Sequence, residues 1–315
     1  MALTVVVMDA FDIVIVGGGA AGLSAALVLA RSRRRVLVVD AGTPRNGPAS
    51  HMHGFLSRDG MPPADLLDVG RAEVRGYGGI ITAGSVVEVV RDSAGFDVVT
   101  DEGERISARR VLVATGLRDE LPDVAGLRAL WARDVLHCPY CHGWEVRDRT
   151  LGVLWNGPDT PRFAQILRQW TQDLTLIAPE GILSADQHAQ LTARGVDVAE
   201  GAVTELVLDG DRLSGARLAD GRIIGLHALF VPPRLISNND ILLGLGCALD
   251  DHGWVITGPF GATSEPGVWV AGNVTNPRAQ VITAAGEGSA AAIAINADLV
   301  EEEVCRAVAD HAPRA

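Results

Sequence analysis

The sequence predicts an α/β fold with two Rossmann-like dinucleotide-binding domains, one of which is discontinuous. Near the start, an apolar run, a glycine turn and an alanine-rich stretch follow one another, as in a strand, a turn and a helix. Two further strand patterns that end in small residues lie far apart in the chain, and a separate strand pattern begins between them. The chain has 315 residues and is 48% apolar, which is enough for about two domains. We expect the discontinuous domain at 1–118 and 245–315, and the inserted domain at 119–244.

Composition limits the classes of function. The net charge of -12 argues against a nucleic-acid or anionic-membrane surface. Four cysteines in a chain of this length do not form a secreted disulfide framework, so we expect a cytoplasmic protein. The apolar start, Ala2 to Val16, is interrupted by Asp9 and Asp12 and lacks the basic region of a signal peptide. No apolar run is long enough to predict a membrane span.

The first unit, residues 12–26, predicts a dinucleotide site. Its glycines are Gly17, Gly19 and Gly22, which permit a tight turn, close approach of a pyrophosphate and close packing of helix on strand. The amides of Ala20 and Ala21 lie at the start of the helix, where the dipole favours phosphate. The next strand, 36–40, ends in Asp40, at the distance where an acid hydrogen-bonds the adenosine ribose.

Two later segments favour a flavin in this site. Residues 111–116 form a strand that ends in Ala-Thr-Gly, a turn typical of flavoproteins with two dinucleotide domains, and we expect Thr115 and Gly116 to contact FAD. Residues 267–273 resemble the second FAD-contacting strand of those proteins and end in Gly272 and Asn273. That family usually has aspartate at the position of Asn273, but an asparagine can still accept through its carbonyl oxygen.

A predicted helix follows this second strand. It starts near Gln280 and Val281, whose amides would face the flavin ring.

The Cys138-Pro-Tyr-Cys141 segment predicts redox chemistry. This spacing keeps two sulfurs within disulfide reach, and a helix start favours the thiolate. A zinc site is an alternative, but Cys247 and Cys305 stand alone and we expect no metal. A glutaredoxin-like centre and a pair of inert buried cysteines are the other two alternatives.

The order of these motifs resembles the low-molecular-weight thioredoxin reductase family over nearly the whole chain. Thioredoxin reductases carry Asp after the second cysteine, whereas this chain has His142-Gly143-Trp144-Glu145, which resembles the gliotoxin- and holomycin-type dithiol oxidases. Arg45-Asn46 and residues 53–56 also look like that branch. The resemblance implies FAD as cofactor with Arg45 among its contacts, a homodimer, Cys141 against the flavin, and Cys138 meeting the substrate.

The inserted domain departs from the family where a second glycine fingerprint would lie. After the strand 151–154, Trp155 replaces the first glycine, and Pro158 removes an N–H that could bind phosphate. After the strand 174–177, the segment Ala178-Pro179-Glu180 offers no arginine to a 2′-phosphate. We therefore expect NADPH not to bind here; binding in an altered pose is the alternative.

A dithiol that reduces the disulfide must lose a proton, so a base is required. His142 is the first candidate and His137 the second, because imidazole titrates near neutral pH. Five side chains are candidates to line an apolar substrate cleft, or else belong to the core or a dimer interface: Trp131, Tyr140, Trp144, Met52 and Phe55.

We predict an FAD-dependent dithiol oxidase that forms a disulfide in a small-molecule dithiol, with O2 as acceptor and H2O2 as product. One alternative is a disulfide reductase driven by NADPH or ferredoxin. A second alternative is a non-catalytic flavin redox sensor.

Overall fold

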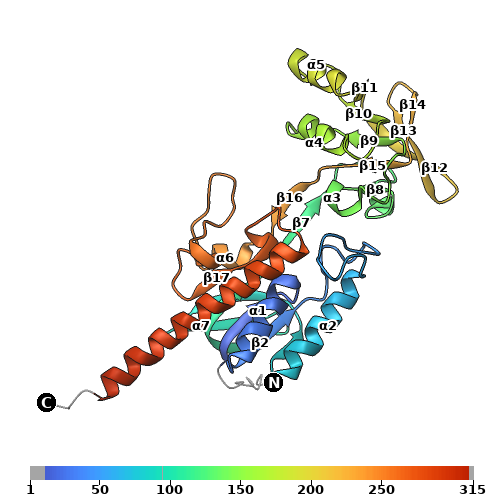
Figure 1. Ribbon diagram of the computed structural model, residues 1–315. Coiled ribbons are helices and arrows are strands. Elements are labelled where there is room, and N and C mark those ends of the chain that lie inside the picture. Colours follow the sequence, from blue (N-terminus) through green and yellow to red (C-terminus); the bar gives the residue numbers. More distant parts are fainter. Residues whose placement is uncertain (1–10, 94, 312–315) are drawn as a thin grey trace, which may run out of the picture.

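The computed structural model describes residues 11–93 and 95–311, and shows two α/β bodies joined by a pair of strands (Figure 1). The apolar start at Ala2 lies largely outside the described residues, as do the last four residues. Within the described ranges, no helix is both long and apolar enough to cross a membrane.

The larger body is built on a seven-stranded sheet in the order β3-β2-β1-β6-β5-β4, with β17 beside β6. β1 pairs in parallel with both β2 and β6, and its side chains are almost all buried, as expected of a central parallel strand. The strands of this sheet are β1 (Phe11–Val16), β2 (Val36–Asp40), β3 (Ile80–Ala83), β4 (Val86–Arg91), β5 (Phe96–Thr100), β6 (Arg105–Val113) and β17 (Val268–Val270).

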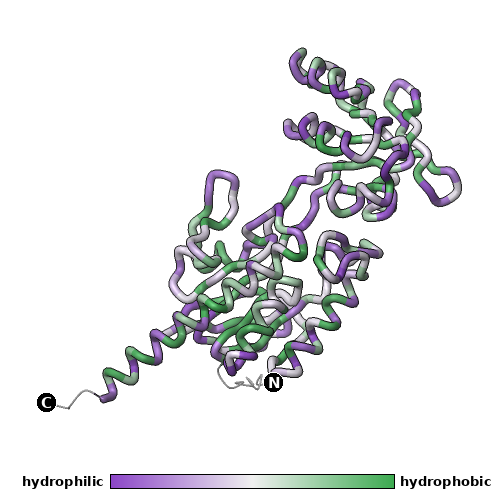
Figure 2. The backbone as a smooth tube through the Cα atoms, viewed as in Figure 1, coloured by the Kyte–Doolittle hydropathy of each residue, from purple (hydrophilic) through white to green (hydrophobic). Residues whose placement is uncertain are grey.

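Helices α1 (Ala20–Arg31) and α7 (Val281–His311) pack on one face of this sheet, and α2 (Pro63–Gly76) packs beside α1 (Figure 1). The opposite face packs against α6 (Asp240–Gly244) and the segment that follows it, which includes Cys247 and Val255. Figure 2 shows the apolar strands enclosed between these layers. Glycine permits the close contact of α1 with the turn before it and with α7. A Cβ on Gly22 would lie 1.9 Å from the Gly17 carbonyl oxygen, and one on Gly288 would lie 2.0 Å from that of Ala21.

The smaller body holds a parallel five-stranded sheet, β11-β10-β9-β15-β8, and an antiparallel three-stranded sheet, β12-β13-β14. Helices α4 (Thr160–Leu167) and α5 (Ala185–Ala193) pack against β9 to β11. The strands are β8 (Val135–Leu136), β9 (Leu151–Leu154), β10 (Leu174–Ala178), β11 (Asp197–Glu200), β12 (Val203–Asp209), β13 (Arg212–Leu218), β14 (Ile223–Gly225) and β15 (Ala228–Phe230).

The two bodies are joined by β7 (Leu117–Glu120) and β16 (Arg234–Ser237), which pair antiparallel between them (Figure 1). The remaining elements are α3 (Pro139–His142) and three short 3-10 helices, η1 (Arg128–Leu130), η2 (Pro259–Gly261) and η3 (Gly272–Val274). The predicted α/β class is confirmed. The boundaries at 118 and 244 stay a prediction: the first falls within β7, whereas the second falls at the end of α6, beyond β16.

Candidate active site

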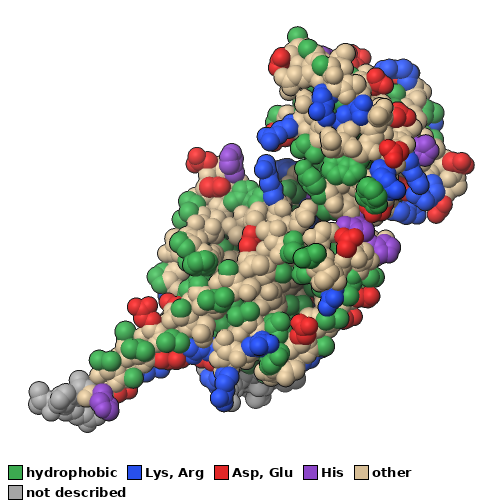
Figure 3. Space-filling view, viewed as in Figure 1, with side chains coloured by type: hydrophobic (Ala, Val, Ile, Leu, Met, Phe, Trp, Pro, Cys, Tyr) green, Lys and Arg blue, Asp and Glu red, His purple; other side chains and the backbone are tan. Residues whose placement is uncertain are grey.

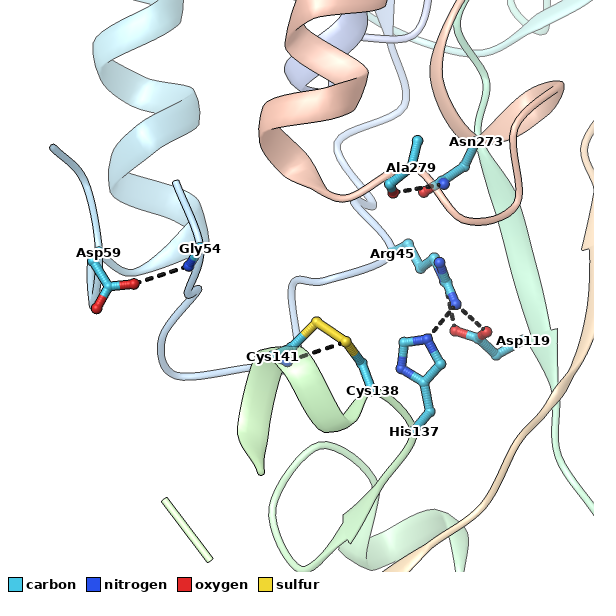
Figure 4. The surroundings of a disulfide bond; sticks show 9 residues. All are labelled: Arg45, Gly54, Asp59, Asp119, His137, Cys138, Cys141, Asn273 and Ala279. Carbon is cyan, nitrogen blue, oxygen red and sulfur yellow. Dashed lines mark hydrogen bonds and ion pairs between the residues drawn. A yellow bond between two sulfur atoms is a disulfide. The ribbon is translucent and has the colours of Figure 1, made fainter. Parts of the chain in front are cut away.

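Cys138 and Cys141 form a disulfide, with an S–S distance of 2.07 Å, at the start of α3 (Figure 4). Cys138 is the N-cap residue, and its sulfur accepts from the backbone N–H of Cys141 at 3.1 Å. Pro139 occupies the first turn, where its missing N–H is no loss. Both cysteines are half-buried, so the pair is shielded but within reach of a small molecule.

The residue types that bind metals are dispersed over the described part of the chain. There, no three His, Cys, Asp or Glu side chains lie close enough together to hold an ion. The remaining cysteines are separate: Cys247 is buried and Cys305 is exposed on α7.

His142, the first candidate base, is the last residue of α3. Its Nδ1 is buried and has no hydrogen-bond partner among the described residues. Burial lowers the pKa of His142, the Glu145 carboxylate opposes that effect, and His53 adds to it. A neutral imidazole with a free nitrogen next to Cys141 fits the role of a base.

His137 is placed differently. Its Nε2 lies 3.1 Å from Nη2 of Arg45, and because a guanidinium carries only donors, Nε2 must accept. Burial, then the nearby Arg45 charge, lowers the pKa of His137 to about 4. With Nε2 already occupied, His137 is the weaker of the two candidate bases.

Arg45 is predicted to contact FAD. It donates two hydrogen bonds, of 2.8 and 2.6 Å, to the carboxylate of Asp119 in β7 (Figure 4). Its Nη1 has no partner among the described side chains and main-chain atoms. One end of the guanidinium therefore stays available to a cofactor.

The N-terminal glycine turn fits a dinucleotide. A Cβ on Gly17 would lie 2.5 Å from the Ala114 carbonyl oxygen, whereas one on Gly19 would enter open space of the kind a pyrophosphate would need. Asp40 lies against this turn and accepts from the N–H of Gly18 at 3.1 Å. Ala20 and Ala21 begin α1, as expected. Sequence reasoning missed Arg71 of α2, which lies 3.4 Å from the Asp40 carboxylate.

The second group of predicted cofactor residues lies around the start of α7. Asn273 donates from Nδ2 to the carbonyl oxygens of Asn276 and Ala279, at 2.9 and 3.0 Å. Its Oδ1 has no partner among the described residues, so it could accept from a ribityl hydroxyl as predicted.

Glu287 and Asn238 were missed. Glu287 accepts from the N–H of Gly272 at 2.9 Å, and Asn238 binds both the hydroxyl and the carbonyl oxygen of Thr115. A lone carboxylate in an otherwise small and apolar helix start is the signal that could have identified Glu287.

Gly116, Gln280 and Val281 remain in places suited to a cofactor. A Cβ on Gly116 would enter open space, and α7 begins at Val281. The side chain of Gln280 reaches the loop of Gly54 in the larger body: its Oε1 would lie 3.2 Å from a Cβ placed there.

The loop after β9, where a second glycine fingerprint would lie, is held by hydrogen bonds of Asn156, although a Cβ on Gly157 would enter open space. Trp155 is half-buried against the core of the smaller body. The backbone N–H of Asn156 donates to the Thr160 hydroxyl at 3.1 Å, and the side-chain amide of Asn156 donates to the Pro232 carbonyl oxygen at 2.9 Å. An amide that a phosphate would use is therefore already bound.

The aromatic candidates differ in exposure, and Trp131 and Phe55 are half-buried. Met52 is 5% exposed and belongs to the core, whereas Tyr140 and Trp144 are each 65% exposed. Tyr140 packs edge-on to Trp170, with ring centroids 5.5 Å apart.

Comparisons with known proteins agree with this geometry. Residues 11–288 match the family described as pyridine nucleotide-disulphide oxidoreductase. Thioredoxin reductase sirT from Leptosphaeria maculans is 32% identical over 91% of this chain and 93% of that protein.

Two solved structures extend the likeness. The crystal structure of HlmI has a TM-score of 0.95 and 49% identity over 98% of this chain and 99% of that chain. The structure of an oxidoreductase from Agrobacterium tumefaciens has a TM-score of 0.86 and 38% identity, over 92% of this chain and 98% of that chain. The resemblance drawn from the motifs is confirmed: the chain belongs to the pyridine nucleotide-disulphide oxidoreductase family and is a thioredoxin reductase-like flavin thiol-disulfide oxidoreductase.

Proposed function

We propose that the protein is an FAD-dependent dithiol oxidase, which forms a disulfide in a small-molecule dithiol through Cys138 and Cys141. The observation that carries the proposal is the half-buried disulfide beside His142, whose Nδ1 has no partner among the described residues. The loop closed by the Asn156–Thr160 hydrogen bond adds to it, because an amide that a phosphate could bind there is already engaged.

The thiol exchange balances as follows. One substrate thiol loses its proton to His142 and attacks the sulfur of Cys138, which forms a mixed disulfide and releases Cys141 as a thiolate. The second substrate thiol then attacks the substrate sulfur of that mixed disulfide, and its proton passes to the Cys138 sulfur that leaves. The product leaves as a disulfide, and Cys138 and Cys141 are left reduced. When bound, FAD would accept two electrons from the reduced pair and pass them to O2, giving H2O2.

The cofactor would be held by two groups of residues at the same end of the larger sheet. The glycine turn with Asp40 would bind the adenosine diphosphate part. Residues near the flavin would be Arg45 and the set Thr115, Gly116, Gly272, Asn273, Gln280 and Val281.

A disulfide reductase is the second candidate, because the relative from Leptosphaeria maculans carries that name. The closed loop after β9 argues against NADPH as the electron source but not against a protein such as ferredoxin. Direct reduction by NADPH would therefore separate the two candidates.

A homodimer and a cytoplasmic location complete the proposal. Exposed apolar side chains run along α7 at helical spacing and continue onto the end of the helix that projects from the body (Figure 3). They are Ile293, Val300, Val304 and Val308. A second copy of the chain would cover this stripe.

Cys138→Ser and Cys141→Ser test the thiol relay. Each variant should keep its FAD, since the cofactor residues are elsewhere, and lose dithiol-dependent oxygen uptake and H2O2 formation. Cys305→Ser, at an exposed position on α7, is the matched control and should behave as wild type. Turnover of dithiol at the wild-type rate by either active-site variant would refute the relay.

A further inference from the structure

The guanidinium of Arg45 connects three separate segments of the chain beside the disulfide (Figure 4). Arg45 lies in the loop after β2, Asp119 lies in β7, and His137 directly precedes Cys138. The guanidinium donates to both carboxylate oxygens of Asp119 and to Nε2 of His137.

We propose that Arg45 is a positioning residue for the redox pair: anchored by Asp119, it holds His137 in one neutral tautomer and fixes the segment that carries Cys138. The inference rests on one part of the proposed function, namely that the Cys138–Cys141 pair exchanges with a dithiol. The contacts themselves are independent of which dithiol or electron acceptor is used.

The Arg45–Asp119 pair has the geometry and burial of a fixed contact. The two side chains are 21% and 11% exposed, and the paired hydrogen bonds match the planar fork of a guanidinium. The next residue of β7 offers a contrast: Glu120 pairs with Arg234 at 2.9 Å, but these side chains are 56% and 73% exposed. Such a surface pair contributes little to stability and provides a matched control.

The tautomer of His137 follows from the donor set. Since Nε2 accepts from Arg45, the ring proton must be on Nδ1, and Figure 4 shows Nδ1 on the side of the ring nearer the disulfide. The charged and titratable groups that act on the ring are Arg45 and His142, which disfavour a second proton, and Asp119, which favours one. The ring of Trp131, 6.2 Å away between centroids, adds apolar cover. His137 therefore stays neutral around neutral pH.

A second polar contact supports the same role for this loop. His53 Nε2 lies 3.5 Å from Glu145 Oε1, four residues after Cys141. The larger body thus contacts the redox helix before its first cysteine and after its second. The side chains of the Arg45–Asp119 pair are less exposed than those of the His53–Glu145 pair.

The first arm of the test is the titration of His137, followed by NMR with isotope-labelled histidine and assigned with His137→Asn. In wild type the signal should not titrate between pH 5 and 8. Arg45→Gln should raise the midpoint by about one pH unit or more, because a like charge is removed. Asp119→Asn should not raise it, because Asp119 is the group that favours the cation. Arg234→Gln should match wild type.

The second arm is reduction of the disulfide by dithiothreitol in anaerobic single turnover, read by quenched alkylation and mass. Reduction of Arg45→Gln and of Asp119→Asn should each be slower than reduction of Arg234→Gln by about tenfold or more, because the disulfide would no longer be held in the geometry for attack. Arg45→Lys should keep His137 neutral but remain slow, because an ammonium lacks the fork.

FAD content, measured for each variant, separates this role from cofactor contact, since Asp119→Asn keeps the Arg45 side chain. An unchanged His137 midpoint in Arg45→Gln, or reduction of both variants at the control rate, would overturn the inference. If the variants behave as expected but wild type consumes no oxygen with dithiols, the positioning role stands and the proposed function fails.

Discussion

Replacement of His142 by alanine gives the most informative test of the proton path. The imidazole lies next to Cys141, and its Nδ1 is buried without a partner among the described residues. General base help is typically worth about a hundredfold to ten-thousandfold, so His142→Ala should lower dithiol turnover within that range. FAD content should not change, because the predicted cofactor residues are elsewhere.

The pH profile gives this prediction its sign. Because burial lowers the pKa of His142, the neutral base dominates at pH 7. As the pH increases, wild-type activity should therefore increase up to a pH below 7 and then stay level. Without the base, turnover depends on thiolate already present in solution. A thiol with a pKa of about 8.5 is about 3% thiolate at pH 7 and about half at pH 8.5. The variant should therefore recover about sixteenfold over that range, as the same thiol pKa dictates.

The assay is dithiol-dependent oxygen uptake under saturating oxygen from pH 5.5 to 9. His188→Ala is the control, since His188 lies on α5 beside Glu200 and away from the disulfide. If His142→Ala matches wild type across neutral pH, His142 is not the base. The proton must then go to His137 or to a residue of a second subunit.

The remaining predictions concern α7 and the dimer. Glu303 of α7 accepts from Arg34 and Arg109, and these bonds lower its pKa to about 2. Its charge stabilises the fold above the unfolded pKa of about 4.3, and this contribution is lost as the pH falls towards 2. Glu303→Gln should therefore lower the melting temperature at pH 7, and the difference should shrink below pH 4.5; an equal difference at pH 7 and pH 3 would contradict this. Val304→Asp, in the exposed stripe of α7, should shift the mass in light scattering from dimer to monomer, whereas a dimer that persists at micromolar concentration would place the interface elsewhere.

Much of the fold could be predicted because local signals are strong. The glycine turn between β1 and α1, and the apolar strand that ends at Asp40, are specified by residues close in sequence. The disulfide is consistent with the two-residue spacing of its cysteines, and α3 begins at this pair, where a helix start was expected.

Contacts between distant residues could not be predicted in the same way. Nothing near Arg45 in the sequence indicates that Asp119 and His137 lie beside it, because that depends on how the two bodies meet. For the same reason the sequence left open whether the aromatic candidates line a cleft or belong to the core: Met52 is buried, while Tyr140 and Trp144 face solvent. Sequence reasoning identified residue types suited to chemistry but not which of their atoms remain free.

The central claim, that a dithiol rather than NADPH delivers electrons, is tested most directly by anaerobic titration of the flavin absorbance. NADPH at millimolar concentration should leave the absorbance near 450 nm unchanged, because the loop of Trp155 and Asn156 is already closed. A dithiol added next should bleach it in wild type but not in Cys138→Ser, and air should restore it with formation of H2O2. Rapid bleaching by NADPH alone would contradict the account and favour a reductase.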